Sequence, residues 1–142
     1  MSTEQNKAAV RRLFDEVWSK GNLDAADELV ADGYVFHDPM APGVRGAEGF
    51  KRMVAMYRAG YPDLRFTVED QLADGDKVAT RWSCEGTHRG ELMGIPATGK
   101  RTNTSGVDIA RFEKGKIVED WSRWDALGWL RQLGVVPPVG KA

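Results

Sequence analysis

The chain has 142 residues and a mass of 15.7 kDa, which is the usual size of one domain. It contains 20 Lys and Arg against 21 Asp and Glu, and this balance excludes the strongly basic surface of a nucleic-acid or anionic-membrane binder. A single cysteine, Cys84, excludes an intramolecular disulfide and a cysteine-based zinc site. The polar start and the lack of a long apolar run predict a cytoplasmic protein without a membrane span.

The first part of the chain has the apolar spacing of helices. Apolar residues between Ala9 and Trp18 recur at helical intervals, with Thr3 as the expected N-cap and Gly21 as the end. A shorter helix is predicted for residues 23–31 and a short strand for residues 34–39, which ends at a proline. After a loop, a third helix is predicted for residues 46–61.

From residue 63 onward the apolar period changes to two. This alternation predicts strands near residues 64–69, 77–88, 101–112 and 116–124, with an irregular stretch over residues 89–100. A last short helix, residues 126–133, precedes a proline-rich tail at 135–142 within a single domain, 1–142. Helices first and strands later predict an α+β fold: three N-terminal helices packed on a curved, mostly antiparallel sheet that forms a cone-shaped barrel. Such a cone leaves room for a small-molecule cavity.

The hairpin around residues 113–115 carries the most informative polar residues. A three-residue loop that ends in Gly115 predicts that Phe112 pairs with Lys116 and that Asp108 lies opposite Asp120. The face that holds both aspartates also holds Gly106, Ala110, Phe112, Val118, Ser122 and Trp124. We expect this face to line the cavity. The other face, with Ile109, Ile117 and Trp121 beside charged residues, is suited to a subunit interface, and a homodimer or higher oligomer is expected.

Two carboxylates about 5 Å apart in an apolar cavity repel each other and lose hydration. Both effects raise a carboxyl pKa, so the pair would be suited to general acid/base chemistry. The alternative is that Asp108 and Asp120 face solvent, as most aspartates do.

Other side chains are candidates for the same site. His37 lies on the short strand and could act as a base, orient the aspartates or donate a proton, or it could be held by Asp38. His88 is expected at the cavity rim or on a surface loop. The remaining candidates for substrate contact, which could equally be core residues, are Trp18, Tyr57, Phe112, Ser122 and Trp124. Residues 90–99 could be a mobile lid. The sequence lacks phosphate-loop, HExxH and G-x-S-x-G motifs, so no metal and no cofactor are expected.

Several stretches resemble the SnoaL-like polyketide (ester) cyclases, whose fold is the nuclear transport factor 2-like cone. The segments are Gly90–Lys100, Lys114–Trp121, Leu130–Gly134, Phe36–Pro39 and Gly46–Phe50, and the resemblance covers nearly the whole chain. It implies an intramolecular aldol cyclisation in which an aspartate is the general base, without metal or cofactor. By the same resemblance the family's base falls at Ser122 and its histidine partner at Asp108. We therefore hypothesise that the base has moved to Asp108 or Asp120.

Two classes of function follow. One is a cofactor-free enzyme that abstracts a proton α to a carbonyl of a small apolar compound, with cyclisation or isomerisation as the outcome. The other is a non-catalytic binding or dimerisation module of the same fold, which the serine at the family's base position favours. Epoxide hydrolysis would require an arginine between two carboxylates, and Arg81 is the strand arginine that could lie near them.

Overall fold

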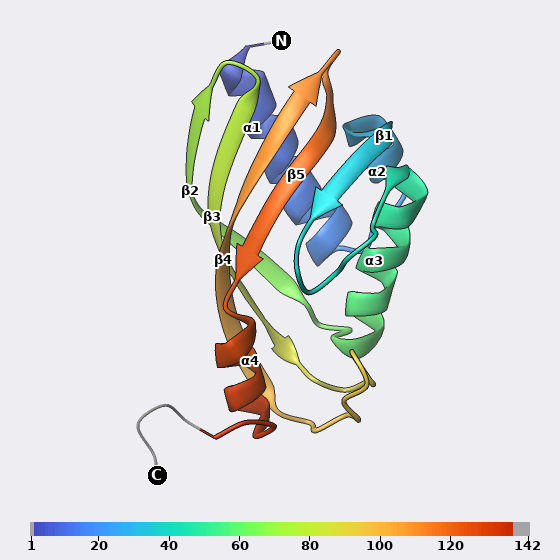
Figure 1. The fold of residues 1–142 in the computed structure, drawn as a ribbon, viewed down its shortest axis with the longest axis vertical. Coiled ribbons are helices and arrows are strands. Elements are labelled where there is room, and N and C mark those ends of the chain that lie inside the picture. The colour runs from blue at the N-terminus through green and yellow to red at the C-terminus, as the bar shows by residue number, and fades with distance from the viewer. Residues whose placement is uncertain (1, 138–142) are drawn as a thin grey trace.

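The computed structural model describes residues 2–137 as helices on one side of a curved sheet (Figure 1). The proline-rich end, residues 138–142, lies outside the described residues. In chain order the elements are α1 (Thr3–Arg12), the π-helix η1 (Leu13–Ser19), α2 (Ala25–Leu29), β1 (Val30–His37), α3 (Gly46–Gly60), β2 (Arg65–Asp74), β3 (Lys77–Thr87), β4 (Arg101–Glu113), β5 (Lys116–Trp124) and α4 (Ala126–Leu133). The predicted α+β fold is confirmed. Within residues 2–137, no helix combines the length and the apolar character needed to cross a membrane.

The first helix begins at Thr3, the residue that was predicted to be its cap. Ser2, not Thr3, is the N-cap: its hydroxyl accepts from the Gln5 amide at 3.1 Å, and the Gln5 side chain accepts from the Ser2 amide at 3.0 Å. This reciprocal pair is a capping box, which leaves Thr3 inside the helix. The helix continues into η1, whose wider turn directs Phe14 and Trp18 toward the interior.

The sheet has the strand order β1-β5-β4-β3-β2. Strands β2 to β5 are antiparallel neighbours, whereas β1 pairs in parallel with β5. The first strand starts at Val30 rather than at residue 34, because the chain passes directly from α2 into β1, and Gly33 lies within the strand. The register shift between Val30 and Val35 accommodates this early start.

The register of the β4–β5 hairpin differs from the prediction. Glu113 pairs with Lys116, so the loop has two residues, and both have positive φ: 51° at Lys114 and 80° at Gly115. This is the geometry of a type I′ turn, whose twist matches that of the strands. The extra residue is accommodated in β5 as a bulge. Phe112 pairs with Ile117 and Arg111 pairs with Glu119, so one residue of β5 between them has no partner in β4.

This bulge changes which residues face each other across the hairpin. Asp108 is opposite Ser122, and Asp120 is opposite Ala110, so the two aspartates are diagonal neighbours and not directly opposed. Beyond the bulge the register differs from the predicted one by two residues. A shift of two keeps each side chain on its predicted face, so both carboxyls remain on the same face. Ile117, which was expected on the outer face, is fully buried inside, because the bulge shifts it there.

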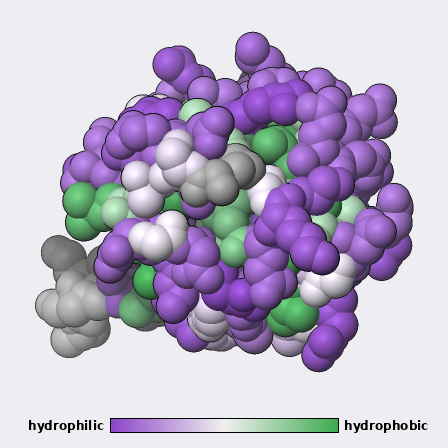
Figure 2. Space-filling view, turned by 90° about the horizontal axis from the view of Figure 1, so that it is seen from above, coloured by the Kyte–Doolittle hydropathy of each residue, from purple (hydrophilic) through white to green (hydrophobic). Residues whose placement is uncertain are grey.

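Helices α1, η1 and α3 cover one face of the sheet, and α4 lies beyond the end of β5 (Figure 1). The buried apolar residues between these layers form one large core and a smaller cluster around Tyr61, Leu92 and Trp129 next to α4. Seen from above, the molecule is mostly hydrophilic with small apolar patches (Figure 2). The buried apolar residues of the two clusters surround the cavity.

Candidate active site

A cavity of about 90 Å³ lies between the helices and the inner face of the sheet. Its wall is mostly aromatic and aliphatic, with aspartates as its most buried polar groups. Trp18 is the central aromatic residue: its ring centroid lies 5.7 Å from that of Tyr57 and 5.3 Å from that of Phe66. Such a wall holds an apolar ligand by contact and leaves orientation to the few polar groups.

Asp108 and Asp120 both line this cavity and are both buried. Trp82 Nε1 donates to Asp108 Oδ1 at 2.7 Å across the β3–β4 pair. Ser122, the cross-strand neighbour of Asp108, also interacts with this carboxyl. The alternation of β4 and β5 brings the two acids to one face, and the bulge at the hairpin preserves that parity.

Burial is the main cause of the unusual acidity of this pair. It raises the pKa of Asp108 to about 6, although hydrogen bonds from Trp82, Asp120 and Ser122 act in the opposite direction. The pKa of Asp120 is raised well above its ordinary value, first by burial and then by the negative charge of Asp108. The two acids therefore titrate as a coupled pair that retains a proton to higher pH than an ordinary aspartate does.

Tyr34 borders the same acid pair. Burial and then the charges of Asp120 and Asp108 raise the pKa of its phenol well above the ordinary value, so the hydroxyl stays protonated. Among the described residues, neither the Tyr34 hydroxyl nor Asp120 Oδ1 has a hydrogen-bond partner. Buried polar atoms are normally paired, and the electrostatic interaction of the Tyr34 hydroxyl with Asp120 links these two groups.

Asp38 is a third acid on the cavity wall, and the sequence analysis did not assign it to the site. Its Oδ1 accepts from the Met40 amide at 2.8 Å, and its Oδ2 accepts from Trp124 Nε1 at 3.2 Å. Strand parity could have identified it, because Tyr34, Phe36 and Asp38 alternate on one face of β1 and its extension, and both aromatics are buried.

The predicted substrate-contact residues divide into two groups. Trp18, Tyr57 and Trp124 line the cavity. Phe112 and Ser122 are buried on the same face of the hairpin but are not among the lining residues, since Ala110, Ile117 and the aspartates stand nearer to the open space. The role of each residue in binding remains a prediction.

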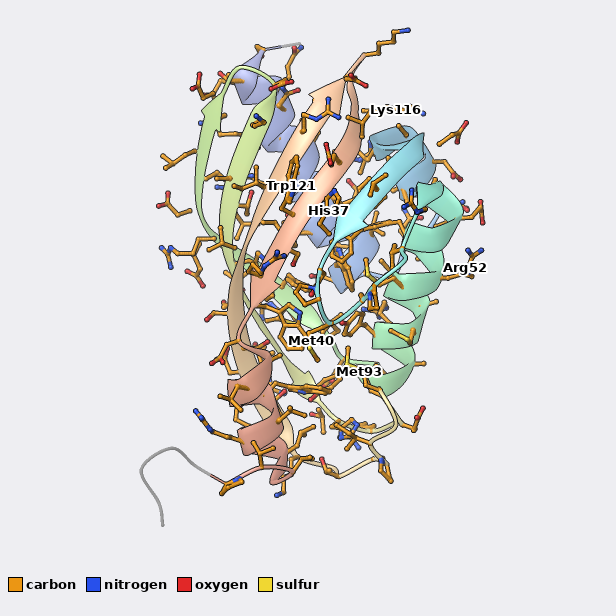
Figure 3. The ribbon with its side chains drawn as sticks, in the orientation of Figure 1. His37, Met40, Arg52, Met93, Lys116 and Trp121 are labelled. Atoms are coloured by element: carbon orange, nitrogen blue, oxygen red, sulfur yellow. The ribbon has the colours of Figure 1, made fainter. Side chains whose placement is uncertain are left out.

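His37 lies on the opposite side of the sheet from its predicted place. Its side chain is 40% exposed, its Nε2 lies 2.7 Å from Glu119 Oε2, and its ring stacks on Trp121 at 5.4 Å. Figure 3 shows His37 and Trp121 side by side on β1 and β5. The cause is the alternation of β1, which turns His37 outward when Phe36 and Asp38 point inward. His37 therefore cannot contact a ligand in the cavity.

His88 is neither at the cavity rim nor on the surface. It is 0% exposed, its Nδ1 lies 3.0 Å from Thr98 Oγ1, and its ring stacks on Tyr61 at 5.5 Å. The backbone bonds from His88 to Lys100 and from Gly99 back to His88 extend the ladder beyond the end of β3. His88 thus anchors the connection between β3 and β4.

Leu92 is the part of this connection that reaches the cavity. Met93 and Gly94 form a tight turn with positive φ, and Leu92 and Ile95 are joined across it by two backbone hydrogen bonds. This turn lies at the lower end of the molecule, where Met93 is labelled in Figure 3. Leu92 thereby closes the cavity between α3 and α4.

Comparisons with known proteins agree with this architecture. The family described as "SnoaL-like polyketide cyclase" matches residues 8–133. The aklanonic acid methyl ester cyclase of Streptomyces peucetius is 31% identical over 130 residues, covering 88% of each chain, and the nogalonic acid methyl ester cyclase of Streptomyces nogalater is 30% identical over 121 residues, covering 82% of this chain and 89% of the relative.

Solved structures give the same result. TsrD from Streptomyces laurentii superposes with a TM-score of 0.87 at 26% identity, over 96% of this chain and 99% of that one. A SnoaL-like polyketide cyclase from Agrobacterium tumefaciens has a TM-score of 0.77 at 27% identity, over 94% and 100% of the two chains. The fold, the cavity between helices and sheet, and these matches lead to one conclusion: the chain belongs to the SnoaL-like polyketide cyclase family.

Proposed function

We propose that this protein is a cofactor-free cyclase that uses general acid/base chemistry on a small, largely apolar carbonyl compound. The observation that carries the proposal is the buried Asp108–Asp120 pair on the wall of an apolar cavity. The relatives that are named as cyclases support the class of reaction. In the family the base stands at the position of Ser122. In this protein the Asp108–Asp120 pair would take over its role, because it provides a titratable group in a site from which water is largely excluded.

The chemistry required is removal of a proton from a carbon next to a carbonyl. The charge that develops on the carbonyl oxygen needs a hydrogen-bond donor, and the protonated carboxyl of the pair can be that donor. A carboxyl whose pKa is raised to about 6 also exchanges protons readily near neutral pH. Both properties come from the same cause, the burial of the pair.

The cavity sets a condition on the ligand. Its volume of about 90 Å³ is below the roughly 300 Å³ at which small-molecule pockets usually begin. A polycyclic ligand therefore requires the cavity to widen, and the Leu92 turn is the segment whose displacement would open it. We take aklanonic acid methyl ester, named in the relatives, as the first compound to test.

Turnover of this ester by the wild type and by Asp120→Asn tests the proposal. The variant keeps the side-chain shape and removes the titrating group, so we expect product formation to fall by about 100-fold or more, with an unchanged circular dichroism spectrum. Unchanged turnover in a folded Asp120→Asn protein would remove the pair from the mechanism.

A specific observation also supports a second candidate function. Serine at the position of the family's base, Ser122, cannot act as that base unaided, which favours a binding module that holds a ligand without converting it. Calorimetric binding of the ester by the wild type, with no product after long incubation, would establish this alternative.

We further propose that the outer face of the sheet mediates a homodimer. Val107 and Ile109 are 45% and 39% exposed there, beside Trp121. Helix α4 packs at the end of the sheet and contacts β4, so it leaves this patch open. Light scattering at micromolar concentration should give the mass of two chains, and Ile109→Asp should reduce it to one. A wild-type monomer would contradict the proposal.

A further inference from the structure

Three carboxyls face the cavity, but they are held in different ways. Asp108 and Asp120 interact with each other and share a proton, whereas Asp38 interacts with two N–H donors. Asp38 follows the end of β1, which pairs with β5, the strand that carries Asp120. Its negative charge acts on Asp108, Asp120 and the Tyr57 phenol, so these groups lie near one another around the same space.

We propose that Asp38 is the general base of the reaction and that the Asp108–Asp120 pair is the hydrogen-bond donor to the substrate oxygen. This inference rests on the proposed function, because it assigns roles within that chemistry. It adds a catalytic residue, Asp38, which comes from a different strand than the family's base position at Ser122.

The hydrogen bonds of Asp38 fit the role of a base. Met40 N–H and Trp124 Nε1 each donate to one oxygen of the Asp38 carboxyl, which fixes its orientation. Each carboxylate oxygen can accept two hydrogen bonds, and only one is accepted at each oxygen, so free lone pairs remain. Because Asp38 lines the cavity, those lone pairs can be directed at a bound ligand.

The pair fits the complementary role. A shared proton gives the pair one O–H that can be donated, and the negative charge of Asp38 favours its retention. The Tyr34 hydroxyl, which interacts with Asp120, is a further O–H donor beside the pair. Charge that develops on a carbonyl oxygen at this place is therefore stabilised without a cation.

The proposed step balances as follows. The Asp38 carboxylate takes the proton from the carbon next to the carbonyl, and the electron pair of that C–H bond forms the enolate, whose oxygen accepts a hydrogen bond from the pair. The enolate carbon then forms a C–C bond to a second carbonyl carbon of the same molecule. The resulting alkoxide takes the proton back from Asp38, so the product is an isomer of the substrate and the enzyme is unchanged.

Asp38 also lies between two spaces. Besides the interior cavity, it borders an outer cleft of about 320 Å³ lined by residues 35–39, 42–45 and 123. Asp38 is therefore the acid of the site that borders both the cavity and the outer cleft.

The first test compares turnover of aklanonic acid methyl ester by Asp38→Asn, Asp120→Asn and a charge control. Asparagine can still accept from Met40 N–H through Oδ1 but loses the acceptor for Trp124 Nε1, so circular dichroism and urea unfolding of the variant are measured first. The control is Glu119→Gln, which removes a carboxylate next to Asp120 in sequence but on the outer face. We expect kcat to fall by about 100-fold or more in Asp38→Asn with KM nearly unchanged, and no change in the control.

The second test needs no turnover. The anion of 4-nitrophenol mimics an enolate oxygen, and its visible absorption reports how much anion is bound. Since Asp38 repels this anion, Asp38→Asn should bind it about tenfold more tightly than the wild type or Glu119→Gln. Asp120→Asn, which weakens the donor, should bind it less tightly.

The outcomes separate the two proposals. If Asp120→Asn loses turnover and Asp38→Asn does not, the role of Asp38 is wrong while the proposed function stands. If neither variant changes turnover, the proposed function fails. Equal phenolate affinity in Asp38→Asn, Glu119→Gln and the wild type, or no phenolate binding in any of them, overturns the assignment of Asp38 whether or not the ester is converted.

Discussion

Replacement of Asp108 by asparagine should change how the stability of the protein depends on pH. Burial raises the pKa of Asp108 from 3.8 to about 6, so the folded state binds a proton that the unfolded state has already released. The corresponding stabilisation is complete below the unfolded pKa and is lost as the pH rises through about 6. At 1.36 kcal/mol for each unit, the raised pKa corresponds to about 3 kcal/mol.

The assay is urea unfolding followed by tryptophan fluorescence, which five tryptophans make sensitive. The free energy of unfolding of the wild type minus that of Asp108→Asn should fall by about 2 to 3 kcal/mol between pH 4 and pH 8. Burial, the largest cause of the raised Asp120 pKa, is the same in both proteins, so the pH dependence of the difference reflects mainly Asp108. A difference that does not change with pH would refute the reasoning, because it would mean that Asp108 titrates as it does in the unfolded chain.

Three further substitutions test other parts of the account. Trp82→Phe removes the 2.7 Å hydrogen bond that stabilises the Asp108 carboxylate, so an NMR titration should show its midpoint above 6; an unchanged midpoint would mean the bond is not made in solution. His37→Ala should leave turnover of the ester unchanged, since the imidazole lies outside the cavity, and a loss greater than about tenfold would place it in the mechanism. Gly90→Ala should lower the free energy of unfolding by roughly 1–3 kcal/mol, because the new Cβ would lie 2.3 Å from the Ala59 carbonyl oxygen; a stability equal to that of the wild type would show that the β3–β4 connection can shift.

The sequence was sufficient to predict the fold and the side of the sheet on which the two aspartates lie. Both predictions depend on hydrophobic periodicity, which follows directly from burial. The cross-strand partners of Asp108 and Asp120 were wrong, because a two-residue turn at Lys114 and Gly115 replaced the expected three-residue loop. A lysine with positive φ is not indicated by composition, so the position of the bulge could not be predicted.

The two histidines show a different limit. His37 could have been placed correctly, because the buried Tyr34 and Phe36 on alternate positions of β1 require it to point outward. His88 could not, because its burial depends on the packing of Tyr61 and Trp129 from elements distant in the chain. Contacts of this kind come from tertiary packing and leave no local signal in the sequence.

The measurement that tests the central claim most directly is a carboxyl-detected NMR titration of Asp108 and Asp120, assigned with the two Asp→Asn variants. The account predicts that Asp108 titrates near pH 6 and that Asp120 remains protonated well above its ordinary range. Midpoints near 4 for both residues, as in a model peptide, would contradict the buried, proton-sharing pair on which the proposed chemistry depends.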